Sequence, residues 1–197
     1  MFYGPPFILP APFMLVDGDS LAAGTDGTSI AIEAAKLQFG SQYRMQDVAV
    51  AATTTATMVS RYNTTVGPFA KAITGTKWNY SILGATNDPV NGLSAAQSLA
   101  NLTTLISNSF TNGATGAILH TVPPAQTRDS AQNAIIATLN PTIRTLAASD
   151  SRIRLVDLEV LTPDASDRTI FLNDGTHYTA LGQQVWAVAF NEALASL

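Results

Sequence analysis

Two parts of the chain, far apart in sequence, hold residues that could together carry out nucleophilic chemistry. Ser20 stands directly after Asp19, just beyond an apolar run from Phe13 to Val16. A serine hydroxyl becomes a useful nucleophile only when a base, usually a histidine held by a carboxylate, accepts its proton. The chain has two histidines, so few residues can supply that base.

His177 is the first candidate for the base. It follows Asp174 in the stretch LNDGTHYTALG, and Asp-Gly readily begins a turn that could bring the carboxylate beside the imidazole. If Asp174 accepts a hydrogen bond from the Nδ1–H group, the other ring nitrogen is left to accept from a hydroxyl. Ser20, Asp174 and His177 are therefore a plausible hydrolytic set.

His120 is the second candidate for the base. It ends the apolar stretch GAILH, and no carboxylate lies near it in sequence. We predict that His120 is a buried structural histidine, with the role of base as the alternative.

The stretch LGATNDP, residues 83–89, offers a group that could stabilise negative charge. Gly84 lets the backbone approach closely, and Asn87 carries an amide donor. An oxyanion needs donors placed where charge develops, and the loss of one typically costs about 2.7–4 kcal/mol of transition-state stabilisation. On the other interpretation, Asn-Asp-Pro is only a turn signal.

These residues have to be positioned by strands and helices that alternate along the chain. We predict strands over Phe13–Val16, Asp47–Ala52, Trp78–Leu83, Thr115–Val122 and Ile153–Val160. We predict helices over Ser29–Phe39, from Ser94 to near Gly113, over Asp129–Ala148 and over Tyr178–Leu194. Pro141 should kink the third of these helices or divide it in two.

Strands that alternate with helices indicate βαβ units, a parallel sheet and helices on both of its faces. The predicted fold class is therefore α/β, with three layers. Ligands of such sheets gather at the carboxyl ends of the strands, and Ser20 would lie on that edge.

Composition limits the range of functions. At 197 residues the chain is predicted to be one domain, 1–197. With a net charge of −4 and scattered Lys and Arg, it has no electrostatic footprint for nucleic acid or an anionic membrane surface. The absence of cysteine excludes thiol catalysis and disulfides. Without cysteine, two distant histidines are poor metal ligands, which disfavours a metal-dependent deacetylase, and no cofactor is predicted.

Residues 1–12 form an apolar, Pro-rich segment without a basic region. We predict that the segment lies extended across the surface and is neither a signal peptide nor a membrane-inserting helix. Few lysines and many Ala, Thr and Asn are more typical of an exported or virion-associated microbial protein than of a cytosolic one. The sequence does not indicate an oligomeric state.

Three of the motifs, in their order, carry a resemblance to a known family. GDSL at Gly18–Leu21, GATND at Gly84–Asp88 and DGTH at Asp174–His177 resemble blocks I, III and V of the SGNH (GDSL) hydrolase superfamily. The resemblance extends from about Phe13 to Phe190. It implies a flavodoxin-like α/β/α sandwich with a five-stranded parallel sheet in the order 2-1-3-4-5. It also implies a carboxylic ester hydrolase, of the esterase, lipase or acetylesterase kind.

The resemblance also implies roles for single residues. Ser20 would be the nucleophile, His177 the base and Asp174 the carboxylate that orients the base. The Ser20 N–H and the Asn87 side chain would be oxyanion donors. Asp19 and Asp88 are predicted to be structural, Asp88 by holding the loop that aims Asn87.

The sequence departs from the family at block II, where a glycine usually follows the second strand. Ala52 aligns best with that glycine, and Ala51 or Thr53 would replace it if the register is off by one. Alanine keeps the backbone N–H, so the predicted oxyanion hole consists of Ser20, Ala52 and Asn87. Its methyl group disfavours a positive φ.

Two other interpretations of the motifs are open at this stage. An α/β-hydrolase would use Ser, Asp and His in the same order, but its G-x-S-x-G elbow has Ala22 in place of the last glycine here. An inactive SGNH-fold domain could instead bind carbohydrate or build part of a larger assembly.

The predicted partner is a small-molecule or glycan ester. Short connections without an evident lid favour short acyl groups, such as acetyl esters on carbohydrate. Lysophospholipids and acyl thioesters are the alternatives.

Overall fold

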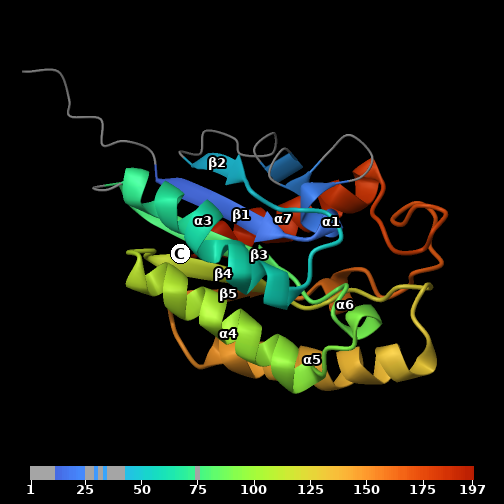
Figure 1. The fold of residues 1–197 in the computed structure, drawn as a ribbon. Helices are drawn as coiled ribbons and strands as arrows, with labels where there is room; N and C mark the ends of the chain where they lie inside the picture. Colours follow the sequence, from blue (N-terminus) through green and yellow to red (C-terminus); the bar gives the residue numbers. More distant parts are fainter. Residues whose placement is uncertain (1–11, 25–28, 31–32, 35–42, 74–75) are drawn as a thin grey trace, which may run out of the picture.

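The centre of the fold is a parallel sheet of five strands in the order β2-β1-β3-β4-β5 (Figure 1). This computed structural model describes residues 12–24, 29–30, 33–34, 43–73 and 76–197. All four neighbouring pairs of strands are parallel. The strands are β1 (Phe13–Gly18), β2 (Arg44–Asp47), β3 (Trp78–Leu83), β4 (Gly116–His120) and β5 (Ile153–Val156). The predicted sheet and its strand order are confirmed.

Helices cover both faces of this sheet. On one face lie α3 (Thr55–Ala72), α4 (Ala95–Thr111) and α5 (Ser130–Ala148). The other face packs against α1 (Ser20–Ala23) and α7 (Ala180–Ala195). Two short elements, η1 (Pro89–Asn91) and α6 (Leu158–Leu161), follow the carboxyl ends of β3 and β5. The three-layer α/β/α architecture agrees with the prediction.

Two hydrophobic cores lie on opposite sides of the sheet because side chains alternate along each strand. In β1, Leu15 belongs to the core under α3, α4 and α5, whereas Met14 and Val16 belong to the core under α7. Strands β3 and β4 are buried along their whole length, as expected for a parallel sheet covered on both faces. The sheet therefore forms a rigid base for the loops at its carboxyl edge.

The second strand differs from the prediction. It covers Arg44–Asp47, whereas Asp47–Ala52 was expected. Beyond it, the Val48 and Val50 N–H groups still donate to the carbonyls of Val16 at 2.8 Å and Gly18 at 3.0 Å. The alternating apolar residues after Asp47 therefore belong to a segment that still pairs with β1 but already turns toward α3.

The ends of other elements differ by a few residues. β5 stops at Val156 instead of Val160, because the next residues form α6. The last helix begins at Ala180, since Thr179 caps it by accepting from the Gly182 N–H at 3.1 Å.

Pro141 does not divide α5, which runs without a break from Ser130 to Ala148, so the predicted division into two helices is wrong. A proline removes one backbone donor, while buried residues on both sides of Pro141 pack this helix against the sheet. The packing of these buried residues therefore outweighs the loss of one backbone hydrogen-bond donor at Pro141.

Helix α3 was not predicted from the sequence. Of the predicted helix over Ser29–Phe39, only Ser29, Ile30, Glu33 and Ala34 are described, and the last three of these are helical. Of the predicted extended segment 1–12, only Pro12 is described, so this prediction lies outside the described residues.

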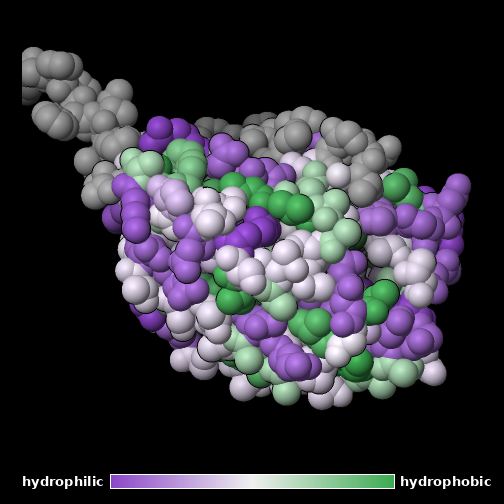
Figure 2. Space-filling model, viewed as in Figure 1, coloured by the Kyte–Doolittle hydropathy of each residue, from purple (hydrophilic) through white to green (hydrophobic). Residues whose placement is uncertain are grey.

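The face formed by α3 and α4 carries small, separated apolar patches among hydrophilic side chains (Figure 2). Such a mixed surface is typical of a layer that faces solvent. Among the described helices, none is both long enough and apolar enough to cross a bilayer.

Candidate active site

The structure brings Ser20, His177 and Asp174 into one chain of hydrogen bonds at the carboxyl edge of the sheet. Ser20 is the first residue of α1, directly after β1, and its Oγ lies 2.9 Å from His177 Nε2. His177 Nδ1 lies 2.6 Å from Asp174 Oδ2. A hydroxyl, an imidazole and a carboxylate in this order are the arrangement that activates a serine.

The turn between Asp174 and His177 orients the carboxylate. Asp174 Oδ1 accepts from the backbone N–H groups of Thr176 at 2.9 Å and His177 at 3.0 Å, which leaves Oδ2 for the ring. Gly175 permits this turn with a φ of 63°. Burial acts to raise the pKa of Asp174, but the hydrogen bonds from the His177 ring and the two N–H groups outweigh it and lower the pKa to about 2. The carboxylate is therefore ionised across the neutral range.

The turn that carries Ser20 is closely packed. A Cβ atom on Gly18 would lie 2.4 Å from the Leu83 carbonyl oxygen, so only glycine fits there. Asp19 is fully buried and caps α1, because its Oδ1 accepts from the Leu21 N–H at 3.0 Å. Burial raises the pKa of Asp19 to about 6, against the lowering effect of the Leu21 N–H, Thr86 and Arg128. Asp19 is thus placed as a structural residue, as predicted.

Asn87 and Asp88 tie the loop after β3 to the start of α3. The Asn87 Nδ2 group donates to the Thr53 carbonyl at 3.0 Å, and an amide has a second N–H to offer. The buried Asp88 carboxylate accepts from the Thr55 N–H at 2.8 Å and from the Thr55 hydroxyl at 2.5 Å. Asp88 therefore fixes the loop that aims Asn87, as the sequence predicted.

Ala52 has the backbone conformation that a glycine would adopt easily. Its φ is 59°, whereas neither Ala51 nor Thr53 has a positive φ. The Ala52 N–H makes no backbone hydrogen bond to any described residue. Ala52 therefore has the backbone conformation expected at the glycine position.

His120 lies away from this chain of hydrogen bonds, in the core under α7. It is 1% exposed, its Nδ1 lies 2.9 Å from the Ile82 carbonyl oxygen, and its ring stacks on Phe190. Burial lowers the pKa of His120 to about 4, which outweighs the raising effect of the bond to Ile82. The structure thus agrees with a structural histidine.

The loop between β4 and α5 was not singled out in the sequence. The Gln126 N–H donates to the Gly175 carbonyl at 2.9 Å, and the Thr127 hydroxyl lies 2.8 Å from that of Thr176. The loop follows the carboxyl end of β4, and that position is the one signal that could have marked it.

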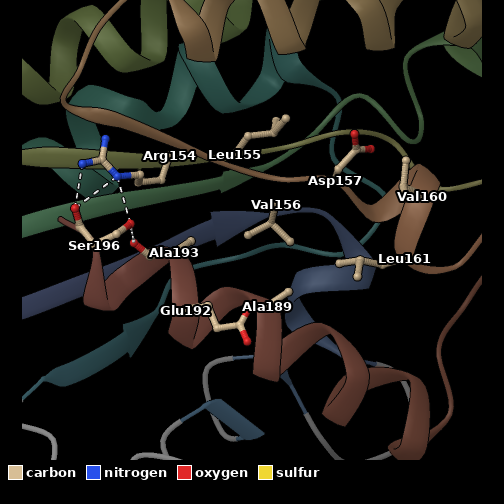
Figure 3. A pocket seen from close by; sticks show the side chains of 10 residues that line it. All are labelled: Arg154, Leu155, Val156, Asp157, Val160, Leu161, Ala189, Glu192, Ala193 and Ser196. Atoms are coloured by element: carbon tan, nitrogen blue, oxygen red, sulfur yellow. Dashed lines mark hydrogen bonds between the residues drawn. The ribbon is translucent and has the colours of Figure 1, made fainter.

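The described part of the chain holds no group of three His, Cys, Asp or Glu residues that could bind a metal ion. A cavity of about 390 Å³ lies between β5, α6 and α7 (Figure 3). Its walls include Val160, Leu161 and Ala189, and at one end Arg154 donates to Ser196. None of its lining residues belongs to the candidate site, so this cavity is separate from Ser20.

Comparison with known proteins gives a consistent result. The sequence model of the GDSL-like lipase/acylhydrolase family matches residues 17–185. No curated protein matches the chain.

Three solved structures share the fold. A member of the lipolytic protein G-D-S-L family from Veillonella parvula has a TM-score of 0.76 and 16% identity, over 95% of this chain and 100% of that one. Axe2, an acetylxylan esterase from Geobacillus stearothermophilus, has a TM-score of 0.73 and 16% identity, over 95% of each chain. TesA has a TM-score of 0.71 and 20% identity, over 94% of this chain and 99% of that one.

Proposed function

Because this chain belongs to the GDSL-like lipase/acylhydrolase family and is a carboxylic ester hydrolase, we propose that it cleaves short-chain esters through an acyl-enzyme on Ser20. The observation that carries the proposal is the continuous path from Ser20 Oγ through both nitrogens of His177 to Asp174, with separations of 2.9 and 2.6 Å. Each neighbour in this path is within hydrogen-bond distance, as proton transfer requires.

In the first half of the reaction, Ser20 Oγ attacks the ester carbonyl carbon while its proton moves to His177 Nε2. The ionised Asp174 stabilises the imidazolium and keeps Nδ1 as the protonated nitrogen of the neutral ring. The tetrahedral intermediate then collapses. The bond to the leaving oxygen breaks, and His177 returns the proton to the departing alcohol. The acyl group stays on Ser20.

In the second half, His177 takes a proton from a water molecule, whose oxygen attacks the acyl-enzyme. Collapse of the second intermediate releases the acid and returns the proton to Ser20 Oγ. In both halves the negative oxygen would be held by three donors, the N–H groups of Ser20 and Ala52 and the second N–H of Asn87. The separate anchors of the two loops keep these donors fixed, so little reorganisation is needed at the moment of reaction.

Two observations support acetyl esters of carbohydrate as the preferred substrate class, the first for the alcohol part of the substrate and the second for the acetyl group. The side chains of His177 and Asp174 are 26% and 45% exposed, so bulky alcohol groups can approach the base from solvent. The structural similarity to Axe2, which is an acetylxylan esterase, points in the same direction.

The test is hydrolysis of p-nitrophenyl esters from acetyl to decanoyl by the wild type and by Ser20→Ala. We expect kcat of Ser20→Ala to fall by at least about 10³-fold, with the residual rate supplied by the oxyanion hole and by binding. The acetyl ester should be the fastest substrate. Labelling of the wild type by an organophosphonate, and not of Ser20→Ala, would mark the nucleophile directly.

A matched control is Ser109→Ala. Ser109 is buried in α4 and donates to the Ile106 carbonyl at 2.8 Å, so the change removes a serine hydroxyl outside the site. Its kcat should equal that of the wild type. Equal activity of Ser20→Ala and the wild type would contradict the mechanism, and faster turnover of decanoyl than of acetyl esters would contradict the substrate class.

A further inference from the structure

The loop from Pro123 to Arg128 holds the turn that carries Asp174 and His177. The Gln126 N–H donates to the Gly175 carbonyl at 2.9 Å, so the loop binds this turn through the backbone. The Gln126 side chain also packs against Gly175, because a Cβ atom on Gly175 would lie 2.6 Å from Gln126 Oε1. The hydroxyls of Thr127 and Thr176 add a second contact at 2.8 Å.

Arg128 closes this loop from the inside. Its side chain is buried, with 7% of the residue exposed, and its Nη1 donates to the Pro123 carbonyl at 2.8 Å. The bond joins the last residue of the loop to the first. Burial lowers the pKa of Arg128 to about 10, so the guanidinium is still charged at neutral pH.

Asp19, the residue before Ser20, carries an opposite charge that also acts on Arg128. Each of the two groups acts on the other, since Arg128 lowers the pKa of Asp19 and Asp19 raises that of Arg128. Asp19 Oδ2 and Arg128 Nη2 are both buried. Buried charges of this kind are tolerated only when an opposite charge accompanies them.

We propose that Arg128 is a positioning residue that couples the Pro123–Arg128 loop to the Asp174–His177 turn and so keeps His177 beside Ser20. It does so by closing the loop through its bond to the Pro123 carbonyl, so that Gln126 and Thr127 stay in contact with the turn. This inference rests on the proposed function, because it assumes that Ser20 and His177 act together. Arg128 itself touches neither the substrate nor the reacting atoms.

The experiment measures kcat and KM for Arg128→Met and Arg128→Lys, each checked for native near-ultraviolet circular dichroism. Methionine keeps the buried stem but removes the charge and the bond to Pro123. A misplacement of about 1 Å at reacting groups can cost about 100-fold, so we expect kcat of Arg128→Met to fall by about 10- to 100-fold. KM should stay within about 2-fold, because substrate contacts are unchanged. Lysine supplies a charged donor that can reach the Pro123 carbonyl and should recover part of kcat.

Thr127→Val tests the same coupling with a change that cannot unfold the core, since Thr127 is exposed. It removes only the contact with Thr176, and we expect kcat to fall by about 3-fold at unchanged KM. The matched control is Thr138→Val, an exposed threonine of α5 that donates to the Ala134 carbonyl at 3.0 Å. Its kcat should match that of the wild type.

The outcomes separate the two proposals. If the wild type hydrolyses esters in a Ser20-dependent way but Arg128→Met and Thr127→Val keep its kcat, the coupling is overturned while the proposed function stands. If Arg128→Met does not fold, Thr127→Val and Arg128→Lys decide: a lower kcat at constant KM supports the coupling, and wild-type kcat in both overturns it. A wild type that is inert toward esters and organophosphonates is a failure of the proposed function itself.

Discussion

At the scale of single residues, Ala52 combines a strained backbone with a proposed catalytic donor. A non-glycine residue at φ 59° places its Cβ close to a neighbouring backbone oxygen, which costs about 1–2 kcal/mol. Hydrogen bonds of Thr53 and Asp88 hold the loop in this shape. The proposed site thus keeps an N–H group in place at the expense of local stability.

Replacement of Ala52 by glycine should therefore raise the free energy of unfolding. Relief of strain favours the variant, and the greater chain entropy of glycine offsets about 0.4–1 kcal/mol of it, so the expected gain is about 0.5–1 kcal/mol. Activity should be retained, because the N–H group remains. Urea unfolding and ester hydrolysis measure the two quantities. Ala51→Gly is the control: Ala51 has no positive φ, so it should lose stability, and a loss at both positions would contradict the interpretation of strain.

His120 makes stability depend on pH. Its pKa is about 4 in the folded protein and about 6.5 in an unfolded chain. The stability that neutral His120 contributes is therefore fully present above pH 6.5 and is lost as the pH falls toward 4. At about 1.4 kcal/mol per pKa unit, the loss amounts to about 3 kcal/mol. Asp19, with its raised pKa, acts in the opposite direction over an overlapping range.

Because Asp19 also titrates in this range, the pH dependence of the wild type alone would not isolate the effect of His120. The measurement therefore compares the wild type with His120→Gln at each pH. His120→Gln has no titrating ring, and its amide can still donate to the Ile82 carbonyl. We expect the difference in unfolding free energy between wild type and His120→Gln to shrink by about 3 kcal/mol from pH 7 to pH 4. Stability curves that run parallel over this range would show that His120 does not carry the effect.

At the scale of elements, helix α3 shows where local sequence signals fail. Its sequence, TATMVSRYNTTVGPFAKA, is rich in Thr and Val and contains Gly67 and Pro68, all of which lower helix propensity. The helix forms because Met58, Tyr62 and Val66 are buried against the sheet. Tertiary packing thus decides an element that propensity does not favour, whereas α4, with its capping box at Ser94 and regular apolar spacing, was predictable.

The start of α3 also depends on a residue from another element. We expect Asp88→Ala to lower the free energy of unfolding by about 1–3 kcal/mol, because the buried Thr55 N–H and hydroxyl lose their acceptor. It should also lower kcat, since the loop that aims Asn87 is released. Ser94→Ala removes the cap of α4 instead, at a cost of about 1 kcal/mol, and should keep kcat. Equal kcat in the two variants would contradict a role of Asp88 in aiming Asn87.

At the scale of the whole molecule, the sheet order was implied by the family resemblance, which three short and local motifs carry, and the structure has that order. The same motifs singled out Ser20, Asp174 and His177, and the His177 ring lies within hydrogen-bond distance of both other side chains. The loop from Pro123 to Arg128 was not predicted. Its main contact with the site is a bond between backbone groups of Gln126 and Gly175, and such bonds leave no trace in residue types. The predicted position of β2 was wrong for a similar reason. Backbone pairing with β1 continues beyond the end of β2, so the residue types there did not mark where the strand stops.

The path from Ser20 to His177 joins residues 157 positions apart. A contact of such long range forms late, because the entropy of closing the intervening chain must be overcome first. A chain emerging from the ribosome would hold its nucleophile and all three proposed oxyanion donors long before the turn at Asp174 is made. The rate at which esterase activity returns during refolding would then report how fast the Asp174–His177 turn and α7 dock onto a sheet that is already formed.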